Sequence, residues 1–157
     1  MTFILNGATA APDIEPDAPL LAALRGPLGL SGPRFGCGAE HCGACVVLVD
    51  GAPAYACTLP LAAVAGRRVE TVEGLGTPDA PHPLQRAFID LQAGQCGYCL
   101  SGILMASAAL LRRVPRPTEA QVREALNPHL CRCGSHNRIL RAVLRAAEEM
   151  APGDVAA

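Results

Sequence analysis

The chain has 157 residues, which suits one ordinary domain or two small ones, and 50% of the residues are hydrophobic. Aromatic residues make up only 3% and Trp is absent, so any core must be aliphatic, and small cores of this kind usually need a covalent or metal crosslink. The net charge of −1 comes without a basic run, which argues against nucleic acid as a partner.

Neither a membrane span nor an export signal is predicted. The longest mainly apolar stretch, Leu100 to Leu111, is shorter than the roughly 20 residues that cross a bilayer. The first seven residues, Met1 to Gly7, lack a basic region and a long apolar region. We therefore expect a cytoplasmic chain without direct membrane insertion, periplasmic only if it is exported together with a partner.

The first half of the chain predicts short strands joined by tight turns. Thr2 to Leu5 forms a strand-like run before Asn6-Gly7, a dipeptide typical of hairpin turns, and a second strand is expected up to Ile14. A short helix is expected from Pro19 to about Arg25, with Gly26 beyond its end.

A second hairpin is predicted from Val46 to Val49 and from Pro53 to Ala56, around the turn Asp50-Gly51. Arg68 to Val72 is expected to be the last strand. The Gly- and Pro-rich segment from Gly74 to Pro83 marks a linker.

After the linker, the apolar pattern takes a helical period. One apolar face is formed by Leu84, Phe88, Ile89 and Leu91. Further helices are expected from Leu100 to Arg113, from a capping box at Thr118 through Leu126, and along a stripe from Ile139 to Met150; the tail after Ala151 is expected to be frayed. The pattern thus predicts a small β-rich domain over residues 1–76 and a four-helix bundle over residues 77–157.

Four cysteines of the first half have the spacing C-x4-C-x2-C-x11-C: Cys37, Cys42, Cys45 and Cys57. The first three match the plant-type [2Fe-2S] pattern, whose fourth ligand comes from further along the chain. Gly36, Gly38 and Gly43 stand among them, and a loop around a cluster needs unusual backbone angles and N–H groups directed at sulfur. We predict a first cluster on these four thiolates.

The other four cysteines have the spacing C-x2-C-x31-C-x-C: Cys96, Cys99, Cys131 and Cys133. Each pair is expected just before a helix, where free N–H groups and the helix dipole favour thiolate charge. Two helix starts would then face each other across a second metal site.

Other uses of the cysteines stay open. Disulfides would suit eight cysteines, but a reducing compartment disfavours them. Structural zinc suits four thiolates, although C-x4-C-x2-C is not a pair of compact two-ligand knuckles. A Rieske centre needs two His ligands, whereas eight thiolates complete two tetrads. We interpret the four histidines as polar loop residues: His41, His82, His129 and His136.

Three segments carry a resemblance to a known family: Phe35 to Cys45, Gln95 to Cys99, and Leu130 to Cys133. They resemble the iron–sulfur subunit of the xanthine dehydrogenase and aldehyde oxidase family of molybdenum hydroxylases, in an order that covers the chain from Phe3 to about Met150. The resemblance implies an α+β chain with two [2Fe-2S] clusters: a plant-ferredoxin-like β-grasp domain over residues 1–76, followed by a helical cluster-binding four-helix bundle over residues 77–157.

The resemblance also implies a large catalytic partner subunit that carries molybdopterin cytosine dinucleotide with molybdenum and acts on an N-heterocycle or an aldehyde. Electrons would pass from it to the helical cluster and then to the β-domain cluster. Gln95, through its side-chain amide, and Cys133, as a cluster ligand, would lie against the pterin. Arg132 is left without a role, and a solvated helix face is expected from Arg138, Arg141 and Arg145.

The chain departs from the family pattern at two places. Gly134-Ser135-His136 follows the last cysteine where many relatives have Thr-Gly-Tyr, and Ala39-Glu40-His41 stands where Gly-Glu-Gly is frequent. These departures leave the electron acceptor open between a cytochrome c and a flavin subunit.

Two competing hypotheses remain: a free-standing two-cluster ferredoxin-like carrier or redox sensor, and a zinc-stapled structural adaptor. No catalytic residue is expected in this chain, because it shows no Ser-His-Asp set, phosphate loop or open metal site.

Overall fold

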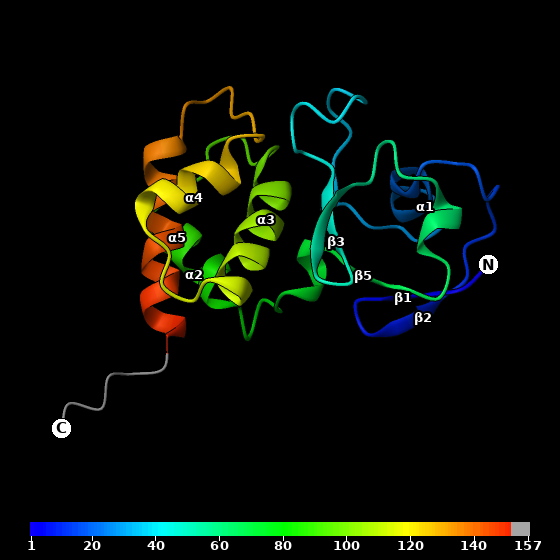
Figure 1. Ribbon diagram of the computed structural model, residues 1–157, viewed down its shortest axis with the longest axis horizontal. Coiled ribbons are helices and arrows are strands. Elements are labelled where there is room, and N and C mark those ends of the chain that lie inside the picture. The colour runs from blue at the N-terminus through cyan, green and yellow to red at the C-terminus, as the bar shows by residue number, and fades with distance from the viewer. Residues whose placement is uncertain (152–157) are drawn as a thin grey trace.

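The computed structural model describes residues 1–151, in which a five-stranded mixed sheet and a group of four helices lie side by side (Figure 1). The strands have the order β2-β1-β5-β3-β4. The predicted α+β class is confirmed. The tail expected to fray after Ala151 lies outside the described residues.

Two hairpins build most of the sheet. β1 (Phe3–Leu5) pairs antiparallel with β2 (Ala8–Ala10), and β3 (Val46–Val49) pairs antiparallel with β4 (Ala52–Tyr55). Both predicted turns have positive φ at both turn residues, as a two-residue hairpin loop requires. β5 (Arg68–Glu70) lies between them, parallel to β1 and antiparallel to β3.

Two strands are shorter than predicted. β2 ends at Ala10 rather than Ile14, two residues before Pro12, which has no N–H for a strand ladder. β5 ends at Glu70, because the N–H of Thr71 donates to Oδ1 of Asn6 (2.9 Å), and a 3-10 turn, η2 (Val72–Gly74), follows.

The short helix α1 (Leu20–Arg25) begins one residue later than predicted, since Pro19 is its extended N-cap residue. It contributes Leu20 and Leu24, both fully buried, to the core beneath the sheet. A second 3-10 turn, η1 (Leu61–Val64), was not predicted, because a single turn is too short to show a helical period.

The helical half contains α2 (Pro83–Asp90), α3 (Leu100–Arg113), α4 (Glu119–Leu126) and α5 (His136–Met150). The predicted limits of α3 and the capping box before α4 are confirmed. One helix-face prediction was wrong: Ile89 of α2 is 69% exposed, while Leu84 and Phe88 are buried.

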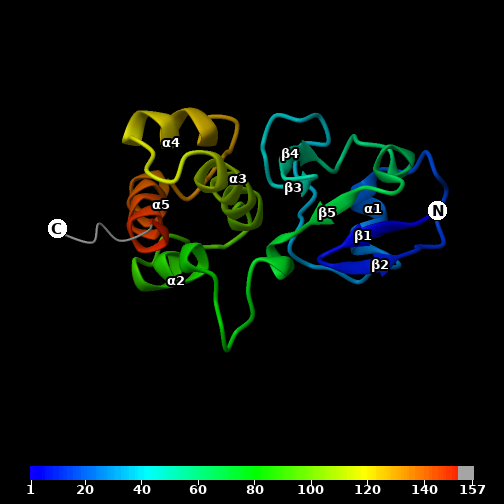
Figure 2. The same ribbon diagram turned by 60° about the horizontal axis from the view of Figure 1, so that its bottom comes forward.

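A loop without helix or strand joins the two halves between Gly74 and Pro83, and Figure 2 shows it projecting away from the body of the protein. The sheet and the helices have separate hydrophobic cores. The two halves meet where α3 packs on β3, and Met105 forms one buried cluster with Val46 and Leu48. Within residues 1–151, no helix combines the length and the apolar character that crossing a membrane demands.

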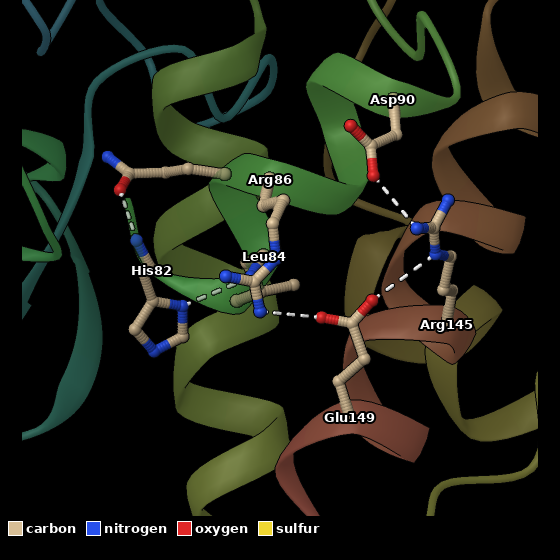
Figure 3. A network of polar contacts seen from close by, with 7 residues as sticks. His82, Leu84, Arg86, Asp90, Arg145 and Glu149 are labelled. Atoms are coloured by element: carbon tan, nitrogen blue, oxygen red, sulfur yellow. Dashed lines mark hydrogen bonds and ion pairs between the residues drawn. The ribbon is translucent and has the colours of Figure 1, made fainter. Parts of the chain in front are cut away.

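An ion-pair network holds α2 to α5 (Figure 3). Arg145 contacts Asp90 (2.8 Å) and Glu149 (3.3 Å), and Glu149 also accepts from Arg86 (2.8 Å). Arg145, expected on a solvated helix face, is partly exposed, and its guanidinium also reaches a carboxylate on the neighbouring helix.

Candidate cluster-binding sites

The first cysteine tetrad lies in the loop before β3 and in the residues after β4. Cys37 is exposed and Cys42 half-buried, while Cys45 and Cys57 are buried next to strands β3 and β4. The N–H of Cys37 donates to Sγ of Cys42 (3.4 Å), and the thiols of Cys45 and Cys57 lie within hydrogen-bond reach. The tetrad is thus arranged as two pairs.

Backbone N–H groups point at the outer pair. Those of Ala39 (3.4 Å) and His41 (3.2 Å) donate to Sγ of Cys37 and lower the pKa of that thiol to about 7. This geometry depends on positive φ at Gly38 and at Glu40. The loop is therefore preorganised to stabilise a thiolate at Cys37.

The inner pair has the opposite character. Burial is the main cause that raises the pKa of Cys45 to about 12. Without a cation this thiol stays protonated at neutral pH, whereas a bound metal would displace the proton and compensate the buried charge.

A side-chain contact closes the loop around the tetrad. The hydroxyl of Thr58 donates to the carboxylate of Glu40, which joins the tip of the loop to the residue after Cys57. Gly36 is also required here by space, because a Cβ at this position would meet Sγ of Cys42 at 2.6 Å.

The second tetrad combines the residues before α3 with those before α5. Cys99 is the N-cap residue of α3, and Cys131 and Cys133 lie ahead of Ser135, the N-cap residue of α5. Side-chain interactions pair Cys96 with Cys133 and Cys99 with Cys131. The structure therefore brings together the predicted four cysteines, again as two pairs.

The second tetrad has an exposed and a buried side too. A hydrogen bond from the backbone N–H of Tyr98 lowers the pKa of the exposed Cys96, with a further contribution from Cys133, whereas burial raises the pKa of Cys99 to about 12. Thiolate character is thus favoured first at the surface, in both tetrads.

Gln95 lies at the exposed edge of the second tetrad. It lies in the loop after α2, since that helix ends at Asp90. Its Nε2 donates to the carbonyl of Cys133 (3.2 Å) and so links the two segments of the tetrad. It also lines a surface hollow of about 760 Å³ that contains Phe88, Ile89 and Arg138.

The sequence did not reveal the role of two histidines. His82 is the N-cap of α2: its Nδ1 accepts the N–H of Leu84 (3.2 Å), while Gln85 accepts the N–H of His82 (2.9 Å) (Figure 3). His129 is buried, and burial lowers its pKa to about 4. The pattern H-x-x-Q before an apolar run could have indicated the first role, whereas nothing local indicated the second.

The cysteine arrangement fits two-iron clusters. No disulfide joins any of the eight cysteines, and each tetrad has two pairs, as two irons with two thiolates each require. Within residues 1–151, no three His, Cys, Asp or Glu side chains converge on a single-ion site.

Two family models match the chain in succession. The 2Fe-2S iron-sulfur cluster binding domain matches residues 3–70, and the [2Fe-2S] binding domain matches residues 71–144. The first range contains one cysteine tetrad and the second range contains the other. The two predicted [2Fe-2S] clusters are thereby confirmed.

Similar proteins are subunits of oxidoreductases. The chain is 54% identical to a nicotinate dehydrogenase subunit of Pseudomonas putida, over 92% of each chain. It is 51% identical to the alpha subunit of isoquinoline 1-oxidoreductase of Brevundimonas diminuta, over 95% of this chain and 98% of that protein. These names favour an oxidoreductase subunit over a free-standing carrier.

A solved structure gives the same result for the fold. The crystal structure of quinoline 2-oxidoreductase from Pseudomonas putida 86 matches with a TM-score of 0.92 and 35% identity, over 99% of this chain and 97% of that chain. With the two cluster-domain matches, these similarities show that the chain belongs to the iron–sulfur subunits of the xanthine dehydrogenase and aldehyde oxidase family of molybdenum hydroxylases.

Proposed function

We propose that the two tetrads are the ligand sets of the two clusters: Cys37, Cys42, Cys45 and Cys57 for one, and Cys96, Cys99, Cys131 and Cys133 for the other. The single observation that carries this proposal is the paired arrangement of four cysteines within each cluster-binding segment. The clusters, when bound, supply one-electron oxidation and reduction. The chain's own part is to supply thiolates, to direct N–H groups at sulfur, and to bury one side of each site.

We place the domain boundary at residue 76, with a ferredoxin-like domain over residues 1–76 and a helical domain over residues 77–157. Two observations support this division. The hydrophobic cores on either side are separate, and the segment after Gly74 forms the loop seen in Figure 2.

The proposed function is electron relay from a large catalytic subunit. We assign the entry point to the helical tetrad, where Gln95 and Cys96 are exposed beside the hollow that contains Ile89. In this proposal the partner carries molybdopterin cytosine dinucleotide with molybdenum, and Gln95 and Cys133 face its pterin. The hydrogen bond between Gln95 and Cys133 would fix both at that surface.

The exit point is assigned to the β-domain tetrad, where Cys37 and its loop are exposed. A flavin subunit or a cytochrome c would accept the electrons there. The substrate of the complex is proposed to be an N-heterocycle or an aldehyde, because relatives are named nicotinate dehydrogenase, isoquinoline 1-oxidoreductase and aldehyde oxidoreductase. A cytoplasmic location remains part of this proposal, because eight cysteines used as metal ligands suit a reducing compartment.

Paired cysteine variants test the ligand assignment and the relay together. The chain is purified anaerobically with its catalytic partner, and electron paramagnetic resonance is recorded after substrate is added. We expect substrate to reduce both clusters of the unaltered complex. Cys57→Ala should remove only one cluster signal, and Cys99→Ala only the other, because each variant opens one tetrad.

Reduction of an external acceptor tests the order of the two clusters in the relay. In Cys57→Ala, substrate should still reduce the remaining cluster while reduction of an external acceptor is lost. Retention of both signals in either variant would contradict the ligand assignment, and unchanged acceptor reduction in Cys57→Ala would contradict the order of the relay.

A further inference from the structure

The two cluster-binding segments touch across the boundary between the halves. The N–H of Leu130 donates to the carbonyl of Cys42 at 3.1 Å. Leu130 is directly bonded to Cys131, and Cys42 belongs to the first tetrad. The backbone of one residue, Leu130, and one hydrogen bond thus separate a cysteine of one tetrad from a cysteine of the other.

The loop at this contact is clamped from two sides. A Cβ on Gly102 of α3 would overlap the carbonyl oxygen of Gly43, and a Cβ on Gly43 would overlap the ring of His129. Gly43 has φ +71°, so its carbonyl and that of Cys42 are held in an orientation that other residues rarely adopt. Residues 42–44 therefore have little freedom to move away from Leu130.

We propose that the hydrogen bond from Leu130 to Cys42 is the bridge by which electrons cross between the two tetrads, and that His129 is the positioning residue that holds it. The proposal rests on the proposed function, since it needs both clusters. One electron leaves the helical cluster, which is oxidised by one unit, and enters the β-domain cluster, which is reduced by one unit. No bond is made or broken and no proton is transferred.

His129 acts by shape in this proposal. Its side chain is buried, its Nδ1 makes no hydrogen bond within residues 1–151, and its ring lies directly against Gly43. Because His129 directly precedes Leu130, any movement of this ring would shift the N–H that reaches Cys42.

A second crossing offers an alternative route. The hydroxyl of Tyr98 donates to the carbonyl of Phe35, and Tyr98 precedes Cys99 while Phe35 lies two residues before Cys37. This route runs along the whole side chain of Tyr98 and then through the backbone from Phe35 to Cys37, so it crosses more covalent bonds. The shorter contact at Leu130 is therefore favoured.

Substitutions at residue 130 test the bridge directly. Leu130→Pro removes the N–H, whereas Leu130→Ala keeps it and trims a side chain that is 63% exposed. The electron-transfer rate between clusters is measured on the complex by rapid freeze-quench paramagnetic resonance after a substoichiometric pulse of reductant. We expect a several-fold slower rate in Leu130→Pro, and an unchanged rate in Leu130→Ala and in Tyr98→Phe.

Two substitutions at His129 test the positioning role, also if Leu130→Pro fails to load its clusters. His129→Phe keeps a ring over Gly43, and His129→Ala removes it. We expect His129→Ala to slow transfer and to speed hydrogen–deuterium exchange of the Leu130 amide, at unchanged midpoint potentials of both clusters. His129→Phe should match the unaltered protein in all three readouts.

The outcomes separate this proposal from the function on which it rests. An unaltered complex without two cluster signals would overturn the proposed function itself. With both signals present, an unchanged rate in Leu130→Pro or in His129→Ala would overturn the bridge, and a rate lowered only in Tyr98→Phe would assign the crossing to the tyrosine.

Discussion

At the scale of single residues, exposure and burial divide each cysteine tetrad. Cys37 and Cys96 receive backbone N–H groups that lower the pKa of their thiols, while burial raises the pKa of Cys45 and Cys99 to about 12. The buried thiols of Cys45 and Cys99 therefore hold their protons most tightly, and a bound metal must displace these protons.

His82 predicts a pH dependence of stability. Its Nδ1 must be unprotonated to cap α2, and burial lowers the pKa of the imidazole below the usual 6.5, helped by the positive charge of Arg112 and opposed by Glu70. Since the folded state binds its proton less readily than the unfolded state, this stability is fully present above pH 6.5 and declines as pH falls below it.

The measurement is the thermal midpoint of the holo-protein at about pH 8 and about pH 5.5, on either side of the unperturbed histidine pKa. His82→Ala should lower the midpoint at the higher pH by the loss of a helix cap, about 1 kcal/mol. His82→Asn should keep a cap that does not titrate, and so should lose less stability on acidification than the unaltered protein. Equal losses in both would show that His82 is not the titrating group.

Sequence patterns located the cysteines but not every residue around them. The spacing of the cysteines is local information, and the structure brings together the same sets of four. The burial of His129 could not be predicted, because it depends on Gly43, a residue far away in the sequence that packs against the ring only after the two halves meet.

At the scale of elements, α3 connects the helical half to the sheet. Its limits were predictable, because a mainly apolar run fills it and two arginines end it. The side of α3 that faces β3 was not predictable, since nearly every position of this helix is buried. Ile89 of α2 was predicted to face the core because it is apolar. It instead lies at the exposed rim of the hollow that Gln95 also lines.

Gly102→Ala tests the contact between α3 and the first cluster loop. The added methyl group would overlap the carbonyl of Gly43, a backbone atom that cannot rotate away. We expect a loss of about 1–3 kcal/mol, typical of overpacking, measured as a lowered thermal midpoint by circular dichroism. The neighbouring Ser101→Ala is the control, because its hydroxyl makes only a long contact of 3.5 Å with Ala44. Equal stabilities of the two variants would contradict a close contact at Gly102.

Glu149→Gln tests the network between α2 and α5 shown in Figure 3. The substitution removes a charge that bridges Arg86 and Arg145, whereas Glu119→Gln removes a charge that pairs with Arg123 on its own helix. We expect the thermal midpoint to fall slightly in Glu149→Gln, less so at high salt, and to stay nearly constant in Glu119→Gln. A fall of the same size in both variants would exclude a special role for the bridge between helices.

At the scale of the whole molecule, two small cores are joined through one interface and a loop. Each half has a small core of its own, and small cores poor in aromatic residues usually need a metal or covalent crosslink. The order of the two halves and their class were predictable from the change of apolar period along the chain. Their docking was not, because Met105, Gly102 and His129 carry no pattern that names their partners across the interface.

The central claim is that this chain holds two [2Fe-2S] clusters for electron transfer. The most direct test is iron and acid-labile sulfide analysis of the anaerobically purified chain with its partner, followed by paramagnetic resonance after dithionite reduction. Two matched domains with two irons and two sulfides each predict four of each per chain, and two distinguishable signals. Zinc without sulfide, and a silent spectrum, would contradict the account.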